Sequence, residues 1–268
     1  MTGLEFLYKT KAGRILLRPL VSKPISSFSG WLMDTRASKV LVSSFARKNN
    51  IRVEDYEVDN VMCFNDFFCR KIKPGLRPIC DDPSCLISPC DGLLSIYRIS
   101  SDTVLNVKQS EFTISGLLRD EKLASCFDGG YALVFRLCVD HYHRYIYFDS
   151  GKQISNVRID GIYHTVRPVA LEQFPVFVQN AREYAVIDSA NFGTAVQMEV
   201  GAMLVGRIVN ENTSPCDVKR GEEKGHFEYG GSTIILLIQK DSAVIDGSFL
   251  TTTEVPVVMG QTIGLKAN

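Results

Sequence analysis

Six short runs of β-branched and aromatic residues constrain the fold of this sequence most. They lie at 131–139 (YALVFRLCV), 143–148, 194–200, 202–209, 232–239 and 254–259. Such residues suit the pleated, half-buried surface of a sheet, and the Gly, Asn, Asp and Pro residues between the runs are typical of turns. Because few helical segments alternate with these runs, a parallel βαβ arrangement is disfavoured. The sequence therefore predicts an α+β protein with a mainly antiparallel β body, arranged like a barrel or a sandwich.

The N-terminal part of the chain has a different pattern. Apolar residues recur there at roughly helical spacing, among them Phe28, Trp31, Leu32 and Met33. From residue 9 to residue 48 there are nine Lys and Arg residues and one acidic residue, Asp34. Basic amphipathic helices of this kind bind the headgroup region of an anionic bilayer, or else their apolar faces pack on the protein. We expect a helical membrane-surface region at 1–58 and a β-rich domain at 59–268.

Length, charge and cysteine content narrow the class of protein. A chain of 268 residues can bury a full core, and a formal net charge of zero provides no general attraction to nucleic acid. None of the eight cysteines forms a CxxC pair, and nothing N-terminal resembles a signal peptide. No apolar stretch approaches the length of a membrane span. We expect reduced cysteines in a cytosolic protein that is soluble or lies on a membrane.

Two of the four histidines, His141 and His143, would lie on one face of an extended segment. Asp140 stands beside them, but no third ligand follows at a spacing familiar from metal sites, so no metal is predicted. A lone histidine is more often structural. The pair between Asp140 and Arg144 favours a functional role.

Asp91, His143 and Ser232 offer an acid, a base and a nucleophile. A triad is defined by geometry, so chain order alone leaves this open, and Asp91 could equally be a plain turn residue. Ser232 follows Gly230 and Gly231 and lacks the G-x-S-x-G pattern of α/β-hydrolases. Glycine provides an unhindered, deformable peptide, which suits attack by the serine hydroxyl on the carbonyl group before it.

Five motifs occur in order from about residue 60 to the C-terminus. They are FNDFF with Arg70 (64–70), KPGLRP (73–78), SPCDG (88–92), YHR (142–144), and RGEEKG followed by GST (220–225 and 231–233). Together they resemble the signature motifs of the phosphatidylserine decarboxylases. The resemblance implies an enzyme, a pyruvoyl-dependent carboxy-lyase of phospholipid biosynthesis that is made as a proenzyme.

The resemblance implies self-cleavage between Gly231 and Ser232. Ser232 would attack the Gly231 carbonyl to form an ester, and β-elimination followed by hydrolysis would leave a covalent pyruvoyl group, the cofactor. The products would be a β chain, 1–231, and an α chain, 232–268. Phosphatidylserine would form a Schiff base with the pyruvoyl group, lose CO₂ and leave as phosphatidylethanolamine.

The same resemblance implies roles for three residues. Asp91 would orient and charge-stabilise His143, and His143 would take the Ser232 proton and later protonate the substrate carbon. Many members of the family read DYHRxH here, whereas this chain has His141 and Ile146 in place of the aspartate and the second histidine. His143 is therefore the expected base, with His164 as the alternative. Arg70, Arg144 and Arg167 are candidates for holding the phosphate.

The implied substrate strengthens the membrane interpretation of the N-terminal region. We expect a peripheral protein at the cytoplasmic face of the cell membrane, anchored by Phe28, Trp31, Leu32 and Met33. Its partners would be phosphatidylserine in an anionic membrane, its own α and β chains, and a second copy in a homodimer, with no nucleic acid. Three rivals remain: a serine hydrolase that uses Asp91, His143 and Ser232 uncut, a non-catalytic lipid-binding relative, and a decarboxylase of a soluble amino acid.

Overall fold

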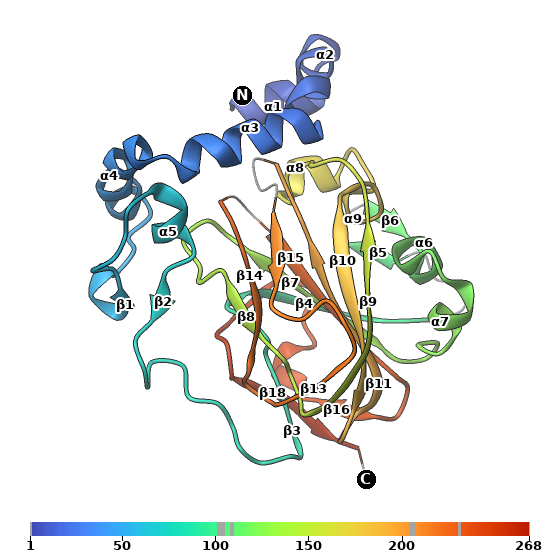
Figure 1. Ribbon diagram of the computed structural model, residues 1–268. Coiled ribbons are helices and arrows are strands. Elements are labelled where there is room, and N and C mark those ends of the chain that lie inside the picture. Colours follow the sequence, from blue (N-terminus) through green and yellow to red (C-terminus); the bar gives the residue numbers. More distant parts are fainter. Residues whose placement is uncertain (1, 101–104, 108–109, 204–206, 230–231, 268) are drawn as a thin grey trace.

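The body of the protein is a large open sheet of eight antiparallel strands (Figure 1). The computed structural model describes residues 2–100, 105–107, 110–203, 207–229 and 232–267. In pairing order the strands are β13 (Cys216–Val218), β9 (Gly151–Ile159), β10 (Arg182–Ser189), β11 (Gly193–Val200), β15 (Ser232–Ile238), β7 (Tyr131–Leu137), β4 (Gly92–Arg98) and β17 (Val255–Val257). In the described part of the chain β13 and β17 are free edges, so the sheet does not close into a barrel.

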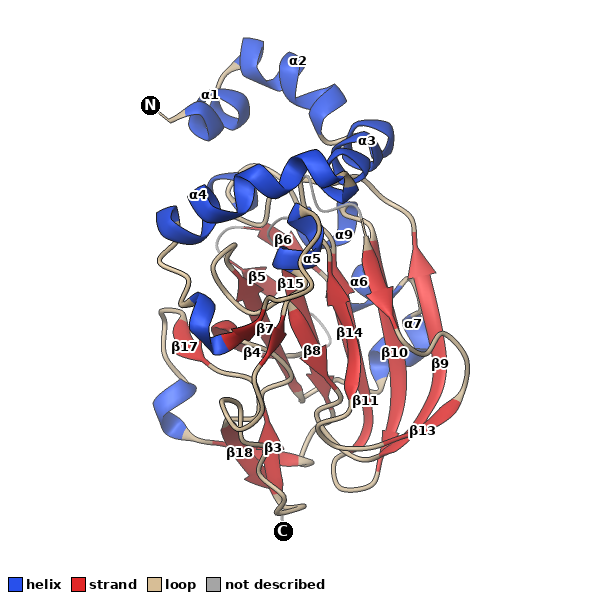
Figure 2. Cartoon of the chain, turned by 60° about the vertical axis from the view of Figure 1, so that its left-hand side comes forward, coloured by secondary structure: helices blue, strands red, loops and turns tan. Residues whose placement is uncertain are grey.

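Smaller sheets complete the β body. The first contains β12 (Ile208–Asn210), β14 (Glu223–Phe227) and β8 (Arg144–Ile146), and the second contains β16 (Ala243–Ile245), β18 (Thr262–Lys266) and β3 (Cys85–Ile87). Two-stranded ribbons are formed by β1 (Tyr56–Glu57) with β2 (Lys71–Ile72) and by β5 (Leu105–Val107) with β6 (Ser110–Phe112). The β8–β14 pair lies over one face of the large sheet, where the Gln197 amide of β11 donates to the Ile146 carbonyl at 3.0 Å (Figures 1 and 2). The predicted α+β class with a mainly antiparallel body is confirmed, and its layering is that of a sandwich.

Helices cover one end and one flank of the sheet (Figure 2). At the N-terminus are α1 (Gly3–Lys9), α2 (Lys11–Leu20), α3 (Lys23–Asp34), η1 (Arg36–Lys39), α4 (Val40–Lys48), η2 (Val53–Asp55) and α5 (Phe64–Phe68). Further along the chain are α6 (Ile114–Leu118), α7 (Glu121–Ser125), α8 (Pro168–Leu171), α9 (Val176–Gln179) and η3 (Gly247–Phe249). Within the described residues, no helix is long and apolar enough to cross a bilayer.

Strand β15 occupies the middle of the core. It pairs with β11 on one side and β7 on the other, and all seven of its residues are buried. A strand covered on both faces needs apolar side chains at successive positions, which is why 234–238 reads Ile-Ile-Leu-Leu-Ile without alternation. This burial fixes the position of Ser232, the first residue of the strand.

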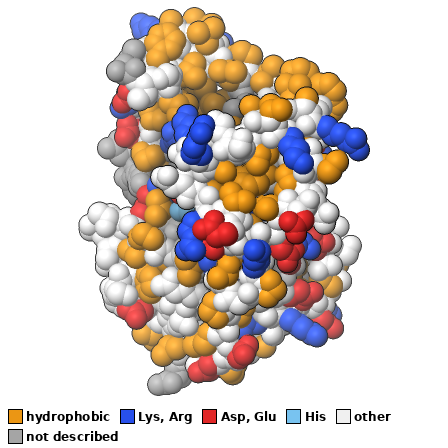
Figure 3. Space-filling model, turned by 90° about the vertical axis from the view of Figure 1, so that its left-hand side faces the viewer, with side chains coloured by type: hydrophobic (Ala, Val, Ile, Leu, Met, Phe, Trp, Pro, Cys, Tyr) orange, Lys and Arg blue, Asp and Glu red, His pale blue; other side chains and the backbone are white. Residues whose placement is uncertain are grey.

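Helices α2 to α4 turn many apolar side chains outward. The large apolar residues exposed there are Ile15, Leu16, Ile25, Phe28, Trp31, Leu32, Val40 and Leu41. The buried residue of α3 is instead Ser26, while Phe28 and Trp31 stack on each other with ring centroids 5.8 Å apart. Figure 3 shows apolar side chains gathered at this end of the molecule. Packing against the protein therefore leaves much of the apolar face of these helices uncovered.

Candidate active site

The predicted nucleophile is a buried hydroxyl at the mouth of the central strand. Ser232 pairs with Leu137 of β7, is fully buried, and its Oγ has no hydrogen-bond partner among the described residues. A buried hydroxyl normally makes a hydrogen bond, so one that serves no structural bond is an unusual feature. Gly230 and Gly231, and with them the expected cleavage bond, lie outside the described residues.

His143 is also fully buried and precedes β8. Its carbonyl accepts from Phe227 N–H at 3.0 Å, and Phe227 ends β14, five residues before Ser232. The Nδ1 atom of His143 lies 2.9 Å from the His141 carbonyl oxygen. Because a carbonyl can only accept, Nδ1 carries the ring hydrogen of the neutral imidazole and Nε2 is its basic nitrogen. This tautomer is the one that a general base acting through Nε2 requires.

The short helix α5 holds His143 and the segment before Ser232 together. Its capping box places Asp66 against the backbone N–H groups of Met62 and Cys63, which fixes the start of the helix. From this helix Phe68 packs on His143, with ring centroids 4.1 Å apart, and on Tyr229, at 5.5 Å. Phe68 of the FNDFF motif thus contacts both His143, the expected base, and Tyr229 of the expected cleavage segment.

The Asn65 side chain of the same motif adds a polar contact to that segment. Its Oδ1 accepts from Tyr229 N–H at 3.1 Å, and its Nδ2 donates to Asp34 at 2.7 Å. The sequence motif contained Asn65 but indicated no role for it. Only the fold brings it to Tyr229, because 164 residues separate the two along the chain.

Asp91 is buried in an ion pair with a residue that the sequence analysis did not single out. Arg77, from the KPGLRP motif, donates to both carboxylate oxygens at 2.8 and 2.6 Å, and Met259 N–H donates to one of them at 2.8 Å. Burial lowers the pKa of His141, and the charges of Asp140 and then Asp91 oppose that effect. Asp91 therefore acts electrostatically on the residue whose carbonyl binds His143.

His164, the alternative base, lies in a different environment. Its Nδ1 is 3.1 Å from the Tyr8 hydroxyl of α1, and its ring stacks on Phe174 at 4.5 Å. Burial lowers its pKa to about 4, so the ring is neutral near pH 7. These contacts tie α1 to the body of the protein.

A cavity of about 540 Å³ adjoins the start of β15. Its walls include Leu137, the register partner of Ser232, together with Tyr229 and Arg167, while Leu4 and Asn49 line it from the N-terminal helices. The cavity therefore lies between Tyr229, just before the expected cleavage bond, and residues at the two ends of the N-terminal helical region.

The three candidate phosphate arginines differ in their surroundings. Arg70 is buried, stacks 4.2 Å from the Tyr56 ring and donates to backbone carbonyls. Arg144 pairs with Glu223 and donates to the Cys69 carbonyl. Arg167 is exposed and lines the cavity, and within the described residues its guanidinium has no hydrogen bond or ion pair. Arg167 is thus the arginine of the three that is available to an anion.

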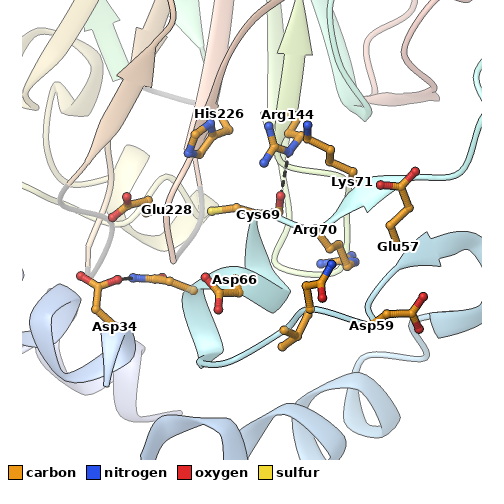
Figure 4. Close-up of a pocket in the computed structure, with 13 residues that line it drawn as sticks. Asp34, Glu57, Asp59, Asp66, Cys69, Arg70, Lys71, Arg144, His226 and Glu228 are labelled. Atoms are coloured by element: carbon orange, nitrogen blue, oxygen red, sulfur yellow. Dashed lines mark hydrogen bonds between the residues drawn. The ribbon is translucent and has the colours of Figure 1, made fainter. Parts of the chain in front are cut away.

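A second cavity, of about 680 Å³, has an acidic lining that includes neither Ser232 nor His143 (Figure 4). His226 lies in its wall, and burial, followed by the charges of Arg144 and Arg207, lowers its pKa to about 4. The other described residues in its wall are Asp34, Glu57, Asp59, Asn60, Val61, Asn65, Asp66, Cys69, Arg70, Lys71, Arg144 and Glu228.

Two clusters among the described residues could supply metal ligands that the sequence spacing did not reveal, and one of them is Glu211, Glu223 and His226. The other lies beside His143. Cys138, Asp140 and His141 each place a potential ligand atom within 4.8 Å of the others. Arg136 donates to the Cys138 sulfur at 3.1 Å, and Cys138 N–H donates to His141 Nδ1 at 3.1 Å. These hydrogen bonds occupy two of the three potential ligand atoms.

Comparison with known proteins agrees with this geometry. A model of the phosphatidylserine decarboxylase family matches residues 64–265. The chain is 39% identical over 266 residues to phosphatidylserine decarboxylase proenzyme 2 of Clostridium acetobutylicum, covering 97% of this chain and 91% of the relative. It is 39% identical over 270 residues to the proenzyme of Ruminiclostridium cellulolyticum, covering 97% and 90%, and 37% identical over 272 residues to that of Clostridium botulinum, covering 98% and 92%.

These matches place the chain among the carboxy-lyases that are made as proenzymes. It belongs to the phosphatidylserine decarboxylase family, which confirms the resemblance carried by the five motifs.

Proposed function

We propose that this chain converts phosphatidylserine to phosphatidylethanolamine and CO₂ with a pyruvoyl group that it makes from Ser232. One observation carries the proposal: the buried Ser232 hydroxyl without a hydrogen-bond partner among the described residues, directly after a glycine pair, in a chain of this family. Cleavage between residues 231 and 232 would yield the β chain 1–231 and the α chain 232–268. The buried strand β15 would then hold the new N-terminus of the α chain in the core.

In the processing step, His143 takes the Ser232 hydroxyl proton as the oxygen attacks the carbonyl of residue 231. The hydrogen bond from Nδ1 to the His141 carbonyl supports this assignment, because it leaves Nε2 as the basic nitrogen. Asp91 would stabilise the imidazolium that forms on His143 through its charge. Asp91 would also hold the turn at Pro89. The Pro89 carbonyl accepts from the N–H of Ile146 at 2.9 Å, and Ile146 lies three residues after His143.

In the decarboxylation step, the pyruvoyl group supplies an electrophilic carbonyl and an electron sink for the loss of CO₂. His143, freed from its role toward Ser232, would then deliver a proton to the substrate carbon. The low exposure of His143 and Ser232 keeps bulk water away from that carbon, which favours protonation by the positioned side chain.

The substrate headgroup would occupy the cavity of about 540 Å³ beside β15. Arg167 would pair with the phosphate, since its guanidinium has no competing partner among the described residues and lines this cavity. The acyl chains would remain in the bilayer, on which residues 1–58 lie through Phe28, Trp31, Leu32 and Met33. The domain of residues 59–268 would be the catalytic part, and the protein would be peripheral at the cytoplasmic face as a homodimer.

Mass spectrometry of the purified full chain tests this proposal. We expect two fragments divided after residue 231, with a blocked N-terminus on the shorter one, and a single chain for Ser232→Ala. A serine hydrolase would instead remain whole and react with a fluorophosphonate. A non-catalytic relative would remain whole and lose no function in the Ser232→Ala variant. A wild-type chain that stays uncut under all conditions contradicts self-processing.

The headgroup site has its own test. Arg167→Gln should raise the KM for phosphatidylserine dispersed in detergent and leave the extent of self-cleavage unchanged, because Arg167 is assigned to the substrate alone. An unchanged KM would remove Arg167 from the proposed site.

A further inference from the structure

The last residue of α3 is tied to the segment that precedes Ser232. One carboxylate oxygen of Asp34 accepts from Asn65 Nδ2 at 2.7 Å, and the other accepts from an Arg207 terminal nitrogen at 2.7 Å. Both are charge-assisted hydrogen bonds, which are stronger than neutral ones. Asp34 is also the one acidic residue from residue 9 to residue 48, a stretch that contains nine basic residues.

Each partner of Asp34 binds a residue just before the glycine pair. Arg207 pairs through Nε with the Glu228 carboxylate, and Figure 4 shows Glu228 and Asp34 on the same side of the acidic cavity. Asn65 accepts from Tyr229 N–H. A backbone N–H can only donate, so the amide oxygen of Asn65 must face Tyr229 and its nitrogen must face Asp34. Two separate polar links thus join α3 to successive residues of the cleavage segment.

Packing alone would not fix the distance between α3 and the segment at residues 228 and 229. A cavity of about 320 Å³ separates α3 from the segment, with Ser26, Trp31 and Tyr229 in its walls. The Ser26 side chain is fully buried there, and its hydroxyl has no hydrogen-bond partner among the described residues. Where apolar contacts are incomplete, the polar links decide the relative position of the two elements.

We propose that Asp34 is a positioning residue for self-cleavage. It holds the segment at 228 and 229 in register with the helix that carries the outward Phe28 and Trp31 side chains, so that efficient processing requires α3 to be docked. This inference rests on the proposed self-cleavage at 231–232 and adds to it a dependence on the N-terminal helix. A residue that only stabilised the fold would change processing and stability together.

The test follows cleavage of the freshly translated full chain over time on denaturing gels. Asp34→Ala should slow cleavage about five- to thirtyfold, the change expected for the loss of one or two net hydrogen bonds. Asn65→Asp should act similarly, because it replaces the donor that faces Asp34 with a second carboxylate oxygen. Asp34→Glu should restore most of the rate. Asp59→Ala is the matched control, since Asp59 is an exposed acid of the neighbouring cavity with no partner among the described residues.

A double-mutant cycle and a stability measurement separate positioning from folding. Asp34→Ala and Arg207→Ala should have non-additive effects on the cleavage rate, because they break one shared link. Urea unfolding is measured for each change in the uncut Ser232→Ala background. A slowing that follows the loss of stability across the variants, or a wild-type rate for Asp34→Ala, overturns the positioning role. A wild-type chain that never cleaves contradicts the proposed function instead.

Discussion

Removal of two outward aromatic side chains of α3 should weaken membrane binding by about a hundredfold. Phe28 is 56% exposed and Trp31 is 59% exposed. With whole side-chain areas of about 200 and 250 Å², some 260 Å² faces water, which at about 25 cal/mol per Å² corresponds to about 6 kcal/mol on full burial. An interfacial helix buries about half of such a face in the bilayer, so the two side chains contribute about 3 kcal/mol to the free energy of membrane binding. A tenfold change in the partition coefficient corresponds to about 1.4 kcal/mol.

The assay is co-sedimentation of the full chain with vesicles of phosphatidylcholine and a smaller fraction of phosphatidylglycerol. We compare wild type with Phe28→Ser/Trp31→Ser, a change that leaves the basic residues in place. The matched control is Val244→Ser/Leu265→Ser, because these side chains are 62% and 51% exposed and pair with each other on β16 and β18, at the opposite end of the molecule (Figure 1).

Two results would refute this reasoning. Equal partitioning of wild type and the α3 variant would mean that the outward aromatic face does not enter the bilayer. Equal weakening by the β16–β18 control would mean that any exposed apolar surface produces the effect. Salt should reduce the membrane binding of wild type and of the α3 variant by the same factor. Both proteins keep the same basic residues, which contribute about 1 kcal/mol each near an anionic surface.

Three further predictions concern the site and the core. His143→Ala should slow self-cleavage by about 10²–10⁴-fold, as expected for a lost general base, whereas His164→Gln should cleave at the wild-type rate on the same gels. The free energy of unfolding should fall by roughly 2 kcal/mol for each of His164 and His226 as the pH drops from about 6.5 to about 4. Burial lowers both native pKa values to about 4, so the unfolded chain binds more protons than the native one between those pH values. His226→Gln should make the plot of the free energy of unfolding against pH less steep. An unchanged plot would contradict the burial of His226 as a neutral ring. Lys224→Met should cost about 3–5 kcal/mol in urea unfolding, because it removes the counter-ion of Glu199 at a site where both side chains are fully buried, and Glu199→Gln in the same chain should recover part of it.

Several features of the fold could be predicted from local pattern. The uninterrupted apolar run after Ser232 predicts a strand buried on both faces, and β15 is buried throughout. The helical spacing around Trp31 predicts α3, and the outward position expected of Trp31 is what the helix has, because among the described residues no element covers that face. The burial of Ser26 on the inner face was not predicted. The sequence left a barrel and a sandwich as alternatives, and the described strands form no closed barrel. Closure requires β13 and β17 to pair, and no local pattern encodes that pairing.

Some features of the candidate site could likewise be predicted from the sequence, and others could not. The chemical nature of Ser232, the glycine pair before it and the YHR motif are visible in sequence, because self-cleavage needs particular atoms on particular residues. The Arg77 partner of Asp91 and the link from Asp34 through Asn65 to Tyr229 join residues that lie 14 or more positions apart in the chain. The Nδ1 hydrogen bond of His143 is local, to the carbonyl of His141, but residue types alone do not encode it. A hydrogen bond depends on distance and direction between side chains, and those are set only when the strands and helices pack together.

The sequence by itself determined the family, the β-rich body and the bond expected to be cut, since residue identity and short-range periodicity carry that information. Only the tertiary structure decided which nitrogen of His143 is basic and that Arg167 lines a cavity beside Leu137, the register partner of Ser232. It also decided that Asp34, the last residue of α3, is linked through Asn65 and Arg207 to residues 229 and 228. The tautomer of His143 depends on the local backbone geometry around His141, which residue types do not encode. The placements of Arg167 and Asp34 depend on contacts between elements far apart in the chain, and the free energy of such contacts exists only in the packed molecule.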